Sequence, residues 1–593
     1  MIDDSAGTIH GRERDPSGPD VTGPGPGRGR VGPVRPPSTG APSVVPGLPP
    51  AFPTGARSAV RGRKMMSRAG RRCQPPAVPR MPPMSPTASS RAASLPATAG
   101  ALRASGWRSR SVKDEVRANL IARKRAGGPL FPGIVGFDRT VIPAVENALL
   151  ARHDFILLGL RGQAKSRLLR ALSTLLDPWL PAVRGCEIHD DPLAPACARC
   201  RRLAREQGDA LEVEWIPPSE RYREKLATPD VTVADLVGDV DPVKAATRRL
   251  TYADEESITY GIVPRTNRGI FAVNELPDLP ARIQVAFLDI LEERDLQIRG
   301  FPVRLPLDLL VVFSANPEDY TNRGSIITPL KDRIDSQVTT HYPRTAEDAL
   351  AITRQEAWSR RDGPVAVRVP EILEAAVEEA VFEARRSEFV DPASGVSQRA
   401  AIAAIECLVS NAERRGLRTG EAYVDARVAD LFAAAPALVG KMELVYEGEQ
   451  QGTEAVARRV LGAAVRRAFE SRFPPVHGKR GAGKRRRGEE PPPEPEDAAY
   501  RPVVRWFAAG NTVDVSDGST AADHRAALEG VDGLLDLART RGAPRDAAEE
   551  TLLMELALEG LHQASVIARE DLDGRVSFKD MLKEMLAGME GED

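Results

Sequence analysis

The sequence predicts an α/β fold with a parallel central sheet, because three apolar segments each lead into a polar cluster. The segments are residues 155–158, 269–273 and 309–313, and a helical pattern follows the first of them. Short apolar runs bounded by turn residues are typical of strands that are buried on both faces, as in parallel sheets. In such sheets the polar residues that follow the strands gather at the carboxyl edge, where ligands bind.

The first predicted strand runs into a glycine loop with the spacing of a phosphate-binding P-loop. Residues 159–166 read Gly-Leu-Arg-Gly-Gln-Ala-Lys-Ser. Backbone N–H groups of such a loop, and the positive end of the helix after it, bind phosphate oxygens. We expect Lys165 to reach the β- and γ-phosphates of ATP and Ser166 to ligate Mg²⁺. The other loop residues expected at the nucleotide are Gly159, Gly162, Gln163 and Ala164.

Ala164 replaces the second glycine of the usual motif, and we expect it to keep a negative φ because of its Cβ atom. The alternative is a chance match in a chain rich in alanine and glycine. Residues 478–485 also fit the spacing of the motif, but they are such a chance match. Arg485 stands where the motif needs a hydroxyl residue, and the surrounding sequence is basic and rich in proline. The strand and the helix that flank residues 159–166 favour that stretch as the functional loop.

The second and third predicted strands supply the polar partners that a P-loop needs. Asn274 and Glu275 follow the second strand as a Walker-B-like pair, and Asn316 follows the third. Glu275 is expected to polarise the attacking water, and Asn316 to contact the γ-phosphate or orient that water. Asn274 stands where an aspartate usually supports Mg²⁺, so weaker metal support is expected. An edge strand that merely ends in polar residues is the alternative.

These motifs together resemble AAA+ ATPases of the magnesium-chelatase type, and also MoxR-type ATPases and minichromosome-maintenance helicases. The resemblance covers about residues 113–420. It is carried by residues 159–166, 268–275, 284–293, 314–317 and 330–333. The resemblance implies a P-loop AAA+ core followed by an α-helical lid.

The resemblance also implies roles for single residues and for the assembly. Asn316 would be the sensor-1 residue, Arg333 the arginine finger offered to a neighbouring subunit, and Arg399 the sensor-2 arginine of the lid. The implied assembly is a homo-oligomeric ring that remodels a protein partner, often a von Willebrand factor A-type protein in relatives. Asn274 departs from the Asp-Glu pair of the family. This difference concerns the rate of hydrolysis and not the binding of the nucleotide.

Two insertions typical of the family have candidates in the sequence. Residues 251–262 alternate in polarity and would form part of the helix-2 insert, and residues 296–305 have the pattern of a pre-sensor-1 β-hairpin. In ring-shaped relatives such hairpins act on a partner or a threaded substrate. A hairpin that only packs against the core fits the pattern equally well.

Four residues between the P-loop helix and the Walker-B-like strand have the spacing of a zinc knuckle. They are Cys186, His189, Cys197 and Cys200, a Cys₃His ligand set within residues 186–200. The alternative is a loop of unrelated thiols with a solvated histidine. Cys407 lies in an apolar helical pattern and is expected to pack in a core.

Composition divides the chain into five parts. We expect a disordered basic tail at 1–112, the ATPase core at 113–343 and a helical lid and bundle at 344–475. A charged, proline-rich linker at 476–499 and a small helical domain at 500–593 follow. The apolar spacing i, i+3, i+4 after residue 343 supports the helical parts.

The first part holds 17 Lys and Arg against 5 Asp and Glu, and is too rich in Pro, Gly and Ser to order itself. A transit peptide is the alternative, as is an over-extended start with Met65, Met66, Met81 or Met84 as initiator. No stretch has the apolar length of a membrane-spanning helix and no signal peptide is visible, so a cytoplasmic protein is expected. The basic run at 479–487 is interpreted as a solvated linker rather than a nucleic-acid contact.

Three functions compete at this point. The first is a ring-forming AAA+ ATPase that remodels a protein partner. The second is a nucleic-acid motor or transcriptional regulator, which has little support because no Gly-Ala-Phe-Thr-Gly-Ala loop or helix-turn-helix stands out and only Arg299 and Arg304 make the hairpin basic. The third is a nucleotide-gated scaffold with little hydrolysis, which Asn274 motivates.

Overall fold

The computed structural model describes residues 95–248, 254–292, 305–316, 325–476, 499–572 and 574–581. Several sequence predictions fall outside these residues. They are the tail up to residue 94, residues 251–253 of the predicted helix-2 insert, the hairpin at 296–305 except for its last residue, and the charged linker from 477 to 498.

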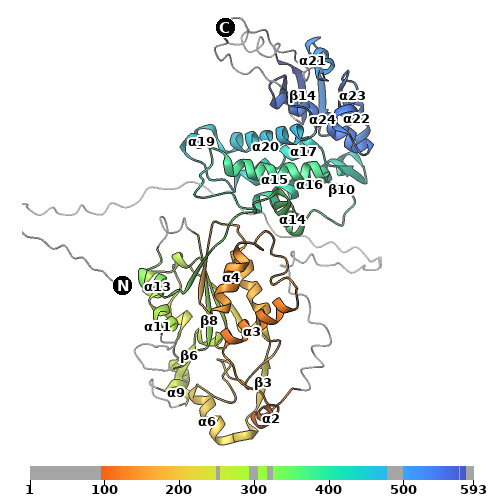
Figure 1. The fold of residues 1–593 in the computed structure, drawn as a ribbon. Coiled ribbons are helices and arrows are strands. Elements are labelled where there is room, and N and C mark those ends of the chain that lie inside the picture. The colour runs from red at the N-terminus through yellow and green to blue at the C-terminus, as the bar shows by residue number, and fades with distance from the viewer. Residues whose placement is uncertain are drawn as a thin grey trace, which may run out of the picture. The chain divides into compact units, whose positions relative to one another are not determined.

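A five-stranded parallel sheet forms the centre of the first folded part (Figure 1), as the sequence predicts. Its order is β4-β7-β8-β1-β9. The three predicted strands occupy its middle: β1 is Phe155–Leu158, β7 is Gly269–Asn274 and β8 is Leu309–Ala315. The edge strands β4, Tyr222–Leu226, and β9, Ser336–Thr339, are more polar and were not predicted.

Side chains that alternate along the central strands fill two separate cores, one on each face of the sheet. Phe155 and Leu157 of β1 pack with helices α3, Val112–Arg125, and α4, Val141–Leu150. Ile156 of the same strand faces the other core, with helices α10, Ala281–Gln284, and α11, Ala286–Glu292. Figure 1 shows the sheet between these two layers. Helices α5, Lys165–Ala171, and α13, Thr328–Arg333, complete the first and second layers respectively.

The folded part begins before residue 113, which corrects the predicted boundary of the tail. Helix α2, Ala99–Ala104, has Thr98 as its N-cap, and Thr98 also pairs with Glu212 in an antiparallel bridge. Trp107 packs edge-on against Trp215 with ring centroids 5.8 Å apart. Residues 95–112 therefore belong to the core rather than to the tail.

Between β1 and β7 the chain forms two small antiparallel sheets and several short helices. Strands β2, Leu180–Val183, and β3, Val213–Ile216, make one sheet, and β5, Gly238–Val240, and β6, Ile258–Tyr260, make the other. The helices are α6, Ala198–Gln207; α7, Pro218–Arg221; α8, Val233–Leu236; and α9, Pro242–Arg248. Short 3₁₀ turns lie at Leu172–Leu175, Gly208–Ala210, Glu255–Ser257 and Pro264–Thr266, and another, Leu276–Asp278, follows β7.

After β9 the chain is mostly helical, as predicted. The helices are α14, Ala346–Glu356; α15, Glu371–Arg386; α16, Arg399–Thr419; α17, Val428–Phe432; α18, Ala435–Val439; α19, Tyr446–Gln451; and α20, Thr453–Glu470. Strand β11, Tyr423–Asp425, lies between α16 and α17 within this mostly helical part. This strand pairs in parallel with β10, Ala366–Arg368.

Residues 499–581 differ from the purely helical domain that the sequence predicts. They form helices α21, Arg501–Ala508; α22, Ala521–Glu529; α23, Leu534–Leu537, which continues as a π-helical turn to Gly542; and α24, Ala547–Gln563. An antiparallel sheet of order β12-β14-β13 accompanies them, with β12 at Val513–Ser516, β13 at Ile567–Leu572 and β14 at Arg575–Asp580.

The same residues share one continuous hydrophobic core with the preceding bundle, to which α15, α16, α20 and α24 all contribute. The part predicted as a domain at 500–593 therefore shares its core with the bundle before it, over the described residues. Cys407 is partly buried and packs against this core, as predicted. Within the described residues, no helix is long and apolar enough to cross a membrane.

Candidate nucleotide-binding and hydrolysis site

The glycine loop lies between β1 and helix α5, where a P-loop is expected. Gly162 has φ 75°, and Ala164, the N-cap of α5, has φ 55°. The negative φ that we expected for Ala164 is therefore wrong. An L-residue in this left-handed region costs about 1–2 kcal/mol relative to the right-handed one. Residues of alternating hand turn successive backbone N–H groups toward one point, which is the geometry of an anion-binding nest.

Lys165 is buried, and its ammonium group lies at the centre of the predicted site. Nζ donates to the backbone oxygen of Gly159 at 2.5 Å, to that of Leu160 at 3.0 Å and to Oδ1 of Asn316 at 2.5 Å. The structure therefore brings together the lysine of the loop and the polar residue after β8. An ammonium group binds a charged phosphate oxygen more strongly than a neutral carbonyl or amide oxygen. A bound phosphate can therefore replace the three neutral oxygens as the partner of Lys165.

Glu275 and Asn316 are in direct contact at the ends of β7 and β8. The side-chain amide of Asn316 donates to Oε2 of Glu275 at 2.6 Å. Glu275 itself has φ 56° and ψ 49°, a left-handed conformation that is uncommon for a residue with a side chain. Such strain persists where the surroundings hold it, and it is often found at functional sites. The proposed water-activating carboxylate is thus fixed both by its backbone and by Asn316.

Asn274 lies beside Ser166, as a metal-supporting residue should. Oδ1 of Asn274 accepts from the hydroxyl of Ser314 at 2.9 Å and from that of Ser166 at 3.4 Å. Its Nδ2 donates to Oε1 of Glu224 at 2.5 Å. Sequence reasoning missed Glu224, because three consecutive charged residues occupy the middle of β4 and no apolar run marks this strand as part of the sheet.

Two glycines of the loop are required by close approaches that sequence reasoning also missed. A Cβ on Gly162 would overlap Oγ of Ser397, and one on Gly159 would overlap Oγ1 of Thr340. Thr340 also donates to Oε1 of Gln163 at 2.7 Å. Ser397 lies two residues before helix α16, so the predicted lid reaches the P-loop through this serine.

The two arginines implied by the resemblance lie elsewhere. Arg333, the last residue of α13, donates from Nε to Oε2 of Glu292 at 2.6 Å, and its side chain is 32% exposed. Arg399 is the first residue of α16, and it is exposed. Neither position tests the predicted role, since an arginine finger acts on the nucleotide of a neighbouring subunit.

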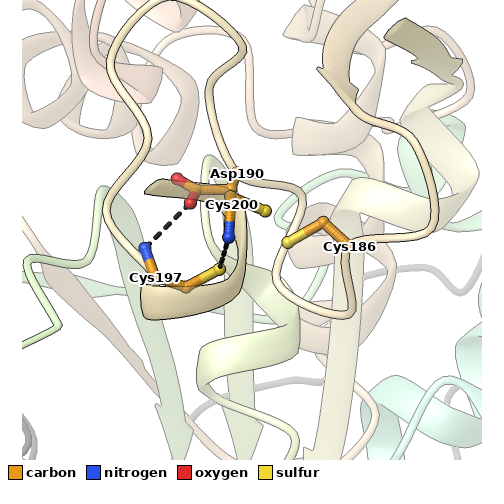
Figure 2. Close-up of side chains that lie close together, drawn as sticks. All are labelled: Cys186, Asp190, Cys197 and Cys200. Atoms are coloured by element: carbon orange, nitrogen blue, oxygen red, sulfur yellow. Dashed lines mark hydrogen bonds between the residues drawn. The ribbon is translucent and has the colours of Figure 1, made fainter. Parts of the chain in front are cut away.

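The cysteine cluster is also present, with one change in its members (Figure 2). The sulfur atoms of Cys186, Cys197 and Cys200 and a carboxylate oxygen of Asp190 all lie within 4.8 Å of one another, and all four residues are buried. Hydrogen bonding among the thiols lowers the pKa of Cys186 to about 2 and raises the pKa of Cys197 and of Cys200. His189, the fourth predicted ligand, does not belong to this group.

No protein-family model matches the sequence. Among solved structures, the chain is similar to a candidate ATPase from Cytophaga hutchinsonii at 17% identity, over 59% of this chain and 95% of that one, with a TM-score of 0.25. NtrX from Brucella abortus in complex with ADP matches at 14% identity over 44% of this chain and 45% of that one, with a TM-score of 0.26. A model of the BchI–BchD complex of magnesium chelatase matches at 20% identity over 54% and 98%, with a TM-score of 0.27. Likenesses at this level of identity and TM-score transfer no function to this chain.

Proposed function

We propose that the protein binds ATP with Mg²⁺ at residues 159–166 and hydrolyses it. The observation that carries this proposal is the chain of contacts from Lys165 through Asn316 to Glu275, at the carboxyl edge of a parallel sheet. Ligands of open α/β sheets bind at this edge. A buried lysine, a left-handed glycine loop and a carboxylate held by an amide are the parts that phosphoryl transfer to water needs.

Each residue has one task in this proposal. The loop N–H groups and Lys165 hold the phosphates, and Ser166 with Asn274 holds Mg²⁺. When bound, the metal neutralises charge that develops on the phosphate oxygens. Glu275 orients the attacking water and accepts its proton, and Asn316 keeps the Glu275 carboxylate in place. Ser397 brings the lid against the loop.

The finer parts of the proposal concern assembly and partners. We propose a homo-oligomeric ring in which Arg333 acts on the nucleotide of the next subunit, because its guanidinium lies on a partly exposed helix end. Arg399 would contribute from the lid. The ring would remodel a protein partner, for which a von Willebrand factor A-type protein is the family precedent. A structural Zn²⁺ in the knuckle at 186–200 is the remaining cofactor.

Asn274 supports a second candidate function, a nucleotide-gated scaffold. A neutral amide in place of a carboxylate weakens the hold on Mg²⁺, so ATP binding without appreciable turnover would then set the assembly.

Purified protein tests both candidates by steady-state phosphate release and by calorimetric titration with ATP–Mg²⁺. We expect wild type to bind and hydrolyse ATP, and Glu275→Gln to bind it but to lose at least about 100-fold in rate, the usual contribution of a general base. Lys165→Ala should weaken binding by roughly 1.5–3 kcal/mol, the worth of a hydrogen bond to a charged group.

Glu146→Gln is the matched control, because Glu146 pairs with Lys124 at the surface and should leave both measurements unchanged. Unchanged affinity in Lys165→Ala would contradict the P-loop assignment. Binding without turnover in wild type would favour the scaffold.

A further inference from the structure

The knuckle carries an inference that rests on the proposed zinc site and changes its ligands. We infer that Asp190, rather than His189, completes a Cys₃Asp zinc site with Cys186, Cys197 and Cys200. Three thiolates and one carboxylate are a four-coordinate donor set that Zn²⁺ accepts. The four donor atoms already lie within 4.8 Å of one another, and all four residues are buried.

The loop holds these donors in place before any metal binds. Both carboxylate oxygens of Asp190 accept from the backbone, Oδ2 from Cys197 N at 2.8 Å and Oδ1 from Ala196 N at 2.9 Å. The sulfur of Cys197, the N-cap of α6, accepts from Cys200 N at 3.3 Å. Figure 2 shows two of these hydrogen bonds, from Cys197 N to the Asp190 carboxylate and from Cys200 N to the Cys197 sulfur. Bonds of this kind orient metal ligands.

His189 is not among the donors that lie within 4.8 Å of one another, and its backbone is left-handed. It has φ 50°, and its carbonyl oxygen lies 3.4 Å from Nη1 of Arg268, which donates to it. The imidazole is buried, and among the residues that the structure describes Nδ1 has no hydrogen-bond partner.

The position of the knuckle assigns the metal a structural role. Asn267, just before β7, donates from Nδ2 to Ile188 O at 3.1 Å, and Ala198 N donates to Glu255 at 2.8 Å. The bound ion would therefore hold the 186–200 loop against both the start of β7 and the turn before β6.

The test uses the full-length protein purified without chelators. We expect about one zinc per chain by elemental analysis in wild type and in His189→Gln, and loss of most zinc in Asp190→Asn and in Cys197→Ser/Cys200→Ser. Cys407→Ser is the matched control, since this cysteine lies in another core, and it should keep its zinc. Zinc K-edge absorption of wild type should lack the multiple-scattering pattern of imidazole, a result that does not depend on whether a variant folds.

The outcomes separate the inference from the site itself. Absence of zinc from wild type would remove the proposed zinc site. Zinc in wild type with an imidazole pattern, or zinc lost in His189→Gln, would overturn Asp190 as the ligand and restore the Cys₃His set.

A second inference comes from an independent observation, the carboxylate beside Asn274. Glu224 lies on β4, the strand next to β7, and accepts from Asn274 Nδ2 at 2.5 Å. Arg170 of α5, one turn after Ser166, holds the same carboxylate with Nε at 2.7 Å and Nη2 at 2.8 Å. A carboxylate only accepts hydrogen bonds, so the NH₂ group of Asn274 must face Glu224. Oδ1 of Asn274 therefore faces Ser166.

We propose that Glu224 is the positioning residue that makes asparagine work at position 274, and that the negative charge usual at this position has moved to β4. This proposal rests on the proposed ATP site. An aspartate at 274 would place two carboxylates in contact, which disfavours the ionised form of one of them. Asparagine and Glu224 are thus expected to depend on each other.

Mn²⁺ affinity of the complex with a non-hydrolysable ATP analogue, measured by electron paramagnetic resonance, tests this dependence. Glu224→Gln should weaken Mn²⁺ binding roughly tenfold, the lower end for loss of a residue that orients a metal ligand. In the Asn274→Asp background the same substitution should cause no loss. Metal-free nucleotide affinity should stay unchanged, which a general loss of structure would not allow.

Glu356→Gln is the matched control, because Glu356 pairs with Arg167 of the same helix α5. Equal effects of Glu224→Gln in both backgrounds, or no effect in the wild-type background, would overturn the proposal. Failure of wild type to bind the analogue would instead overturn the ATP site.

Discussion

Gly162 and Ala164 of the nucleotide site differ in whether the space around them allows a Cβ atom. Gly162 and Ala164 both have a left-handed backbone, with φ 75° and 55°. A Cβ on Gly162 would overlap Oγ of Ser397, whereas Ala164 already carries one. The two positions therefore share a conformational requirement, but only Gly162 also has a steric one.

The residue scale yields the first prediction. Ala164→Gly should raise the free energy of unfolding by up to about 1 kcal/mol, since relief of the left-handed strain is partly offset by a more flexible unfolded chain. Gly162→Ala should lower it and weaken ATP binding, because the lid must move away from the loop. Urea denaturation and calorimetric titration measure the two effects. Similar stability changes of the same sign in both variants would contradict this distinction.

At the scale of elements, the buried ion pair of Arg221 with Glu115 joins helix α3 to the sheet. Arg221, at the end of α7, is fully buried and binds both oxygens of Glu115 at 2.7 Å. The same guanidinium donates to the backbone oxygen of Arg268, directly before β7. Helix, edge strand and central strand are therefore connected at one point.

The second prediction follows from this ion pair. Glu115→Ala should lower the free energy of unfolding by about 3–5 kcal/mol, because it leaves a buried guanidinium without its counter-ion. Glu454→Ala removes the exposed partner of Arg458 and should cost no more than about 1 kcal/mol. Denaturation curves of both variants, recorded under the same conditions, measure the two free energies of unfolding. Equal losses of this free energy would contradict the role of burial.

The elements that sequence reasoning found and missed differ in their hydrophobicity. Strands β1, β7 and β8 are buried on both faces, so each appears as an apolar run. Strand β4 reads Tyr-Arg-Glu-Lys-Leu and lies at an edge, where no such run is needed. Glu224 was missed with it.

Residue spacing alone also failed where backbone conformation decides. Cys186-x-x-His189 has the spacing of a ligand pair, but the donor atoms that lie within 4.8 Å of one another include the neighbouring Asp190 instead, and His189 has a left-handed backbone that spacing does not predict. The antiparallel sheet of residues 513–580 was missed because its strands are short and charged.

At the scale of the whole molecule, strand β7 separates two kinds of site. Asn274 ends the strand at the proposed nucleotide, and Gly269 begins it beside the knuckle that Asn267 contacts. Six residues of strand span roughly 20 Å. The proposed zinc is therefore too far from Glu275 to take part in hydrolysis.

The third prediction concerns the proposed ring, whose active sites need two chains. Glu275 would act within its own subunit, and Arg333 would act on the next subunit after leaving Glu292. An arginine finger contributes about 10³–10⁵ in rate in related phosphoryl-transfer systems. Arg333→Ala and Glu275→Gln should each be nearly inactive alone. Their equimolar mixture should recover activity, because some interfaces then pair an intact Glu275 with an intact Arg333.

Steady-state phosphate release, with subunit exchange confirmed, measures this recovery. Glu292→Gln is the control, because it removes the partner of Arg333 within the chain and leaves both active residues in place, so it should remain active. A mixture as inactive as its components would contradict action between subunits. In that case Arg333 would be a surface residue paired with Glu292, and each chain would have to hydrolyse ATP with its own residues alone.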